Sequence, residues 1–170
     1  MKTKLIIACL VLGSWAANAQ HDHAGHGAEK KTDQSMVMFK DATLGKAYEH
    51  YLHLKDALVA SNQDEAKKAA GELQKSLANV KNSKMVADEV AKVTAAADLN
   101  GQREAFSGVS DMMAMLVKDG KLSMGMIYLE YCPMANNNSG AYWLSNEKQI
   151  KNPYFGDKML KCGSVKETIQ

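Results

Sequence analysis

The sequence predicts an all-α protein: an up-down-up-down four-helix bundle followed by a short extended segment and an ordered, turn-rich C-terminal motif region. Four consecutive segments repeat apolar residues every three or four positions, the spacing of an amphipathic helix. Only two to five residues separate these segments, and such short connections force neighbouring helices antiparallel. Six of the ten aromatic residues beyond position 19 follow residue 122, so the C-terminal region must bury much ring surface and is expected to be ordered.

Local sequence features mark the ends of the helices. Asn62 and Glu65 form an N-cap and capping-box pattern at the start of the second helix. Asn100-Gly101 ends the third helix, and Gly120 ends the fourth. The four helices are expected over about residues 35–60, 63–80, 86–97 and 102–118.

The helical spacing stops after Lys121. Alternation over residues 124–132 predicts an extended segment or a short strand. Turn residues follow at positions 136–140 and at Asn152-Pro153. The predicted single helical domain spans residues 34–170, with the bundle over about 35–119 and a Cys/Met motif region over about 122–165.

The first nineteen residues have the features of a cleaved signal peptide. Lys2 and Lys4 precede a short apolar run, and residues 17–19 form an A-x-A cleavage motif. The run is too short to cross a bilayer, and no later run reaches the length of a membrane span. We therefore expect an exported, periplasmic protein whose mature chain does not insert into the membrane.

Composition excludes several classes of function. The chain has 21 basic and 19 acidic residues, and loss of the two lysines of the signal peptide leaves equal numbers. A neutral chain without a basic stripe has no electrostatic surface for nucleic acid. The sequence has no Cys-x-x-Cys pair, haem-attachment motif, nucleophile elbow or zinc-protease motif. It predicts neither an enzyme nor an organic cofactor.

Residues 20–33 are expected to form a flexible, histidine-rich tail. His21, His23 and His26 place three imidazoles within six residues, and such a chain can wrap one Cu(II), Zn(II) or Ni(II) ion. We predict an auxiliary metal site there. His50 and His53 also have a ligand spacing, but no acidic or cysteine partner clearly shares their face. A surface or hydrogen-bonded pair is favoured for them.

The main candidate site is made of sulfur. Cys132 and Met134 flank a proline that stiffens the chain, and Met159 and Cys162 are three positions apart. Thiolates and thioethers are soft donors that select Cu(I), and by the same softness Ag(I), over hard cations. The alternative is a disulfide between the cysteines, closing a loop of about 31 residues for about 3 to 4 kcal/mol, with both methionines as packing residues.

The other methionines after residue 110 have two interpretations. Met112, Met113 and Met115 crowd the fourth helix, and Met124 and Met126 follow it. They could line a path for a soft metal. Core packing is favoured, because Met112 and Met113 fall on the apolar stripe.

The C-terminal motifs resemble those of a known bacterial family of unknown function. Its members are exported proteins, mostly of Bacteroidetes, and it also forms the C-terminal module of some Cu(I)/Ag(I) RND efflux adaptors, the membrane fusion proteins. The resemblance covers roughly residues 34–165 and implies a helical periplasmic domain associated with copper and silver handling. The chain lacks the other adaptor regions and so looks like the free-standing form. The motifs are 131–135 (YCPMA), 140–144 (GAYWL), 150–156 (IKNPYFG) and 159–163 (MLKCG).

Two functions follow from the sequence. The leading one is a periplasmic Cu(I)/Ag(I)-binding protein that buffers copper or delivers it to an efflux system such as an RND-type adaptor. The alternative is a disulfide-clamped helical interaction module of the cell envelope, with no metal at the cysteines.

Overall fold

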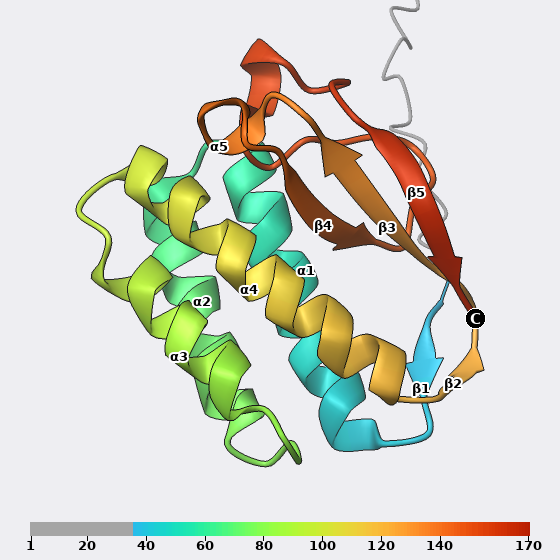
Figure 1. Cartoon of the computed structure of the whole chain (residues 1–170). Helices are drawn as coiled ribbons and strands as arrows, with labels where there is room; N and C mark the ends of the chain where they lie inside the picture. The colour runs from blue at the N-terminus through green and yellow to red at the C-terminus, as the bar shows by residue number, and fades with distance from the viewer. Residues whose placement is uncertain (1–35) are drawn as a thin grey trace, which may run out of the picture. The chain divides into compact units, whose positions relative to one another are not determined.

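The computed structural model describes residues 36–170, so the predicted signal peptide (1–19) and histidine-rich tail (20–33) lie outside the described residues. Figure 1 shows the three-stranded sheet on one side of α1 and α4, with α2 and α3 on the other. The elements in chain order are β1 (Met38–Phe39), α1 (Ala42–Val59), α2 (Gln63–Leu77), α3 (Lys84–Ala95), α4 (Leu99–Asp119), β2 (Leu122–Met124), β3 (Ile127–Cys132), α5 (Ala135–Asn138), β4 (Ala141–Ser145), the short 3-10 helix η1 (Gly156–Lys158) and β5 (Ser164–Ile169).

The predicted all-α class is wrong, because the described chain is a mixed α/β fold with two antiparallel sheets. β1 pairs with β2, and the second sheet has the order β4-β3-β5. The extended segment predicted over residues 124–132 does contain a strand, β3, but β5 was missed. β5 is an edge strand whose side chains are mostly exposed, so it shows no apolar alternation. Its backbone pairing with β3 is non-local, and nothing in its own sequence indicates it.

The four predicted helices are present, with shifted ends. Asn62 accepts a hydrogen bond from the Glu65 amide at the start of α2, as the capping pattern predicted. α1 begins at residue 42 rather than near 35, because β1 precedes it and Asp41 caps it. Asp98 caps α4, so the Asn100-Gly101 pair lies in the first turn of that helix and does not end α3.

A row of aromatic rings joins the helices to the larger sheet. Tyr51 of α1 stacks on Phe106 of α4, with ring centroids 5.5 Å apart. The Tyr51 hydroxyl accepts a hydrogen bond from the Leu144 amide of β4 at 2.9 Å. The complete row of ring contacts is Phe39, Tyr48, Tyr51, Phe106, Tyr154 and Trp143. The expected burial of the C-terminal aromatic residues is confirmed for Trp143 and Tyr154, whereas Tyr142 is 38% exposed and the other three are partly buried.

The helices of the described residues differ from membrane-spanning helices in their length and apolar character. Of the helices in residues 36–170, none is both long enough and apolar enough to cross a bilayer.

Candidate metal centre

The two cysteines of the C-terminal region lie in contact. Cys132 is the last residue of β3 and is fully buried, whereas Cys162 precedes β5 and is partly buried. Tyr131 pairs with Ser164 across the β3–β5 ladder, which brings the two strand ends together. The Cys162 thiol is hydrogen-bonded to Cys132, and both are free thiols in this structure. Two thiols thirty positions apart in the sequence thus meet at one point.

The contact holds Cys162 in its protonated form. Its hydrogen bond with Cys132 and its burial raise the pKa of the Cys162 thiol to about 11. Both influences favour the neutral S–H form of Cys162 over its thiolate. At neutral pH, Cys162 must therefore lose a proton before it can bind a metal as a thiolate.

The two candidate methionines line a single pocket of about 480 Å³. Met134 follows Cys132 by two residues and is 45% exposed, and Met159 lies at the end of η1. Tyr154 also lines this pocket, and burial raises the pKa of its hydroxyl well above the usual value. Each thioether lies within three positions of one of the two cysteines in the sequence.

A left-handed turn sets the position of Met134. Asn136, Asn137 and Asn138 all have positive φ angles, of 51°, 55° and 66°. Asparagine is the side chain, after glycine, that best tolerates this conformation. Asn136 also donates a hydrogen bond to the Ser107 hydroxyl of α4 at 2.8 Å. The predicted turn at 136–140 is confirmed, and it anchors the Met134 segment to the helices.

Asn152 fixes the segment that carries Met159 and Cys162. It is fully buried, and its side-chain amide donates to the Cys162 carbonyl at 2.7 Å. Its side-chain oxygen accepts from the Tyr154 amide at 2.8 Å, and its own amide donates to the Leu160 carbonyl at 2.9 Å. The sequence analysis treated Asn152-Pro153 only as a turn and missed this role.

Arg103 ties the same segment to the helices. This buried residue of α4 donates to the Pro153 carbonyl at 3.0 Å and to the Leu58 carbonyl of α1 at 2.9 Å. Burial lowers the pKa of its guanidinium. Gly156 packs against it with φ of +56°, and a Cβ there would lie 2.8 Å from the guanidinium. Nothing in the spacing of α4 singled out Arg103, because its partners come from other parts of the chain.

Two aromatic residues of the C-terminal motifs, Trp143 and Tyr154, pack beside the segment that carries Cys162. Trp143 is fully buried beneath Gly163, where an added Cβ would lie 2.8 Å from the indole ring. The Trp143 ring meets Tyr154 edge to face at 6.0 Å between centroids. The motifs of the C-terminal region therefore pack on one another and set the positions of both cysteines.

A buried carboxyl group lies two residues before Cys132. Glu130 is fully buried next to the side chain of Trp143. Burial raises its pKa to about 8, although Lys55 and Trp143 act in the opposite direction. Glu130 is thus mostly protonated at neutral pH. The sequence analysis noted it only as part of an alternating segment.

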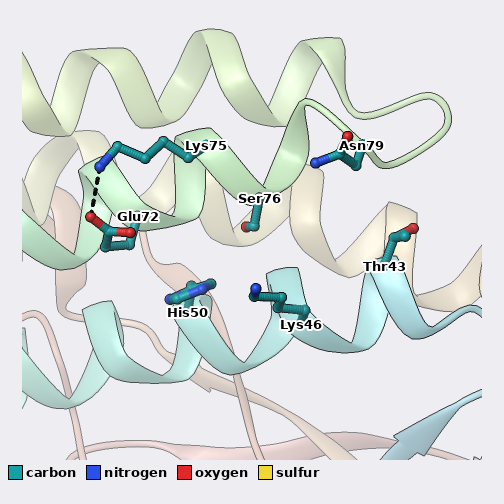
Figure 2. A pocket seen from close by; sticks show the side chains of 7 residues that line it. All are labelled: Thr43, Lys46, His50, Glu72, Lys75, Ser76 and Asn79. Carbon is teal, nitrogen blue, oxygen red and sulfur yellow. Dashed lines mark hydrogen bonds and ion pairs between the residues drawn. The ribbon is translucent and has the colours of Figure 1, made fainter.

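The histidines of α1 pair with α2. His53 Nε2 lies 2.9 Å from a Glu65 carboxylate oxygen, and His50 lines a pocket of about 260 Å³ that also includes Glu72. Figure 2 shows His50 on α1 facing the Glu72 turn of α2, where Glu72 is paired with Lys75. The acidic partners come from the neighbouring helix, which helical spacing within α1 could not indicate.

The three tail histidines, His21, His23 and His26, lie outside the described residues. Within residues 36–170, no group of three or more His, Cys, Asp and Glu side chains is arranged to hold a metal ion.

Comparison with known proteins identifies similarity over the helices. No curated protein and no solved structure matches the chain. Residues 47–125 match a family described as "Protein of unknown function (DUF3347)". The matched segment runs from α1 through β2 and ends before the sulfur motifs. The helical part of the chain is therefore similar to a family of unknown function.

Proposed function

We propose that this protein binds Cu(I) or Ag(I) through the thiolates of Cys132 and Cys162 and the thioethers of Met134 and Met159. One observation supports this function above all: the two thiols lie together, and the two thioethers, each within three positions of one of them in the sequence, line one pocket. In this proposal the protein is exported to the periplasm, where it buffers copper or delivers it to an efflux system such as an RND-type adaptor. The histidine tail (His21, His23 and His26) serves as an auxiliary capture site.

The chemistry of the donors sets the preference for the metal. Thiolate and thioether sulfurs are soft ligands that favour monovalent copper and silver over hard cations. Each cysteine that binds as a thiolate releases its proton, so affinity for Cu(I) rises with pH while Cys162 is protonated in the free protein. Cys132 is buried, so the ion reaches the site from the side of Cys162 and the methionine pocket.

An anaerobic Cu(I) titration of the reduced protein, with a competing chromophoric ligand, tests this function. Cys132→Ser/Cys162→Ser should nearly abolish the affinity, because thiolate is the stronger donor. Met134→Leu/Met159→Leu should lower the affinity clearly and change the free energy of unfolding little, because leucine keeps the approximate volume. Serine variants that fold and keep full affinity would overturn the proposal.

A matched control is available in two methionines outside the site. Met85 and Met115 are 61% and 59% exposed and lie on α3 and α4. Met85→Leu/Met115→Leu removes the same number of thioethers and should leave the affinity for Cu(I) unchanged. An equal loss in this control would mean that the effect of the Met134→Leu/Met159→Leu variant is not specific to the pocket.

The contact between the thiols also favours a second candidate, the disulfide-clamped interaction module. Oxidation of the pair would close a loop of about 31 residues and add about 3 to 4 kcal/mol to the free energy of unfolding. Nonreducing mass spectrometry of the exported protein separates the two functions. A loss of two hydrogens that persists with copper present supports the clamp, whereas thiols that stay reduced and bind copper support the metal site.

A further inference from the structure

Four exposed methionines lie on and beside the small β1–β2 ribbon. The exposed fractions of Met36, Met38, Met124 and Met126 are 69%, 46%, 56% and 37%. The sequence favoured core packing for Met124 and Met126, and the structure contradicts this, although Met113 is fully buried as expected. Large apolar side chains are normally buried, so four exposed thioethers in one place call for an explanation.

The pairing of the ribbon brings these methionines together. Met38 is paired with Met124 in the antiparallel ladder, whose register shifts between Met38 and Phe39. Paired residues of antiparallel strands have Cβ atoms about 5 Å apart on the same face. Long, flexible methionine side chains at that spacing can bring both sulfurs to one ion.

Gly125 brings the outer methionines to the same end of the ribbon. It has φ of +87°, and its backbone lies so close to Met36 and Val37 that an added Cβ would overlap the Met36 carbonyl oxygen. Met126 follows directly, and its sulfur accepts a hydrogen bond from the Gln170 side-chain amide at 3.4 Å. In Figure 1, β1 and β2 lie side by side near the C-terminal end of β5.

We propose that this methionine ribbon, defined as Met36, Met38, Met124 and Met126, is a second site for Cu(I) or Ag(I) that uses thioethers alone. It goes beyond the function proposed above, because it shares no sulfur with the cysteine site. Neutral thioethers are weaker donors than thiolates, so the ribbon fills after the cysteine site and releases its ion more readily. No proton is released on binding, because methionine has none to lose.

The test is a titration of the purified protein with Ag(I), followed by NMR of 13C-labelled methionine methyl groups. Single Met→Leu variants assign each resonance. We expect the methyl resonances of the four ribbon methionines to shift together and to saturate with one further equivalent of Ag(I). The exposed Met85 and Met115 serve as internal controls and should not shift with them. Ribbon resonances that behave like those two would overturn the inference.

Variants separate the ribbon from the cysteine site. Met36→Leu/Met38→Leu/Met124→Leu/Met126→Leu should lose one equivalent of bound Ag(I), and Met85→Leu/Met115→Leu should lose none. If the fourfold variant does not fold, Met38→Leu/Met124→Leu removes the directly opposed pair and should lower the ribbon affinity at least tenfold. In Cys132→Ser/Cys162→Ser the ribbon shifts should persist. Failure of the cysteine site would instead appear as unshifted Met134 and Met159 methyl groups.

Discussion

The interior between α2 and α3 is built from aliphatic side chains, whereas the interior beneath the three-stranded sheet combines aromatic rings with buried polar groups. α2 and α3 contribute mainly alanine, leucine and valine to their core. The C-terminal region buries Glu130, Ser145 and Asn152 beside Trp143 and Tyr154. Apolar packing is non-directional and tolerates small shifts of a helix, while buried hydrogen bonds fix individual atoms. A site that needs sulfurs at set positions is therefore better supported by the C-terminal region.

The largest expected effect comes from the aliphatic core. Leu73 is fully buried in α2, and Leu73→Ala should lower the free energy of unfolding by about 3 to 5 kcal/mol, because it leaves a cavity. The contact between Cys132 and Cys162 should remain intact in the folded variant. Denaturant unfolding and the rate of thiol alkylation under native conditions measure the two quantities. Faster alkylation in the folded variant would show that the packing of α2 affects the positions of the two thiols, contrary to this expectation.

A substitution at Asn152 tests the polar interior in the same way. Asn152→Ala removes the hydrogen bonds to the Cys162 carbonyl and from the Tyr154 amide, and should lower the free energy of unfolding by about 2 to 4 kcal/mol. It should also release the Cys162 segment, so that the Cys162 thiol is alkylated faster in the folded protein. Asn79→Ala, at an exposed position, is the matched control and should change neither quantity. An Asn152→Ala variant as stable as the wild type would refute the assigned role.

Glu130 makes the stability of the polar interior depend on pH. Its pKa is about 8 in the folded protein against a usual value of 4.5, so the folded state holds a proton that the unfolded chain has lost between these values. The contribution of Glu130 to the free energy of unfolding is therefore fully present below about pH 4.5 and is lost as the pH rises toward 8. The expected loss from pH 5 to pH 8 is on the order of 3 kcal/mol.

Glu130→Gln should remove most of this decline and should be more stable than the wild type at pH 8. Unfolding by denaturant at pH 5, 6, 7 and 8 measures the effect. Glu49→Gln, at an exposed position of α1, should leave the decline unchanged. A wild-type protein with no decline over this range would mean that burial does not control the protonation of Glu130.

The smallest effect is expected at the surface of the helices. His53 lies 2.9 Å from Glu65, with half of its side chain exposed, and such ion pairs contribute less than about 1 kcal/mol. His53→Gln should change the free energy of unfolding by no more than that and should leave the affinity for Cu(I) unchanged. A marked loss of affinity in the titration would instead make His53 a ligand and would bring α1 into the metal site.

The helices and the candidate sulfurs could be predicted from the sequence because their determinants are local. Apolar spacing and the Asn62 cap identify helices within a short stretch of chain. Each cysteine is identified as a candidate because a methionine, a second soft donor, lies two or three positions away. Helix ends shifted where Asp41 and Asp98 provide caps that the apolar pattern alone does not show.

Only the tertiary structure decided which strands pair and which side chains are buried, because both depend on residues distant in sequence. β5 is a strand only because β3 lies beside it, and that pairing brings the two thiols into contact. Asn152 and Arg103 act through partners up to fifty positions away. Met124 and Met126 look like core residues in the sequence but are exposed, because β2 pairs with the two-residue strand β1 rather than entering the helix core. Side-chain chemistry is local information, whereas the position of a side chain within the fold is not.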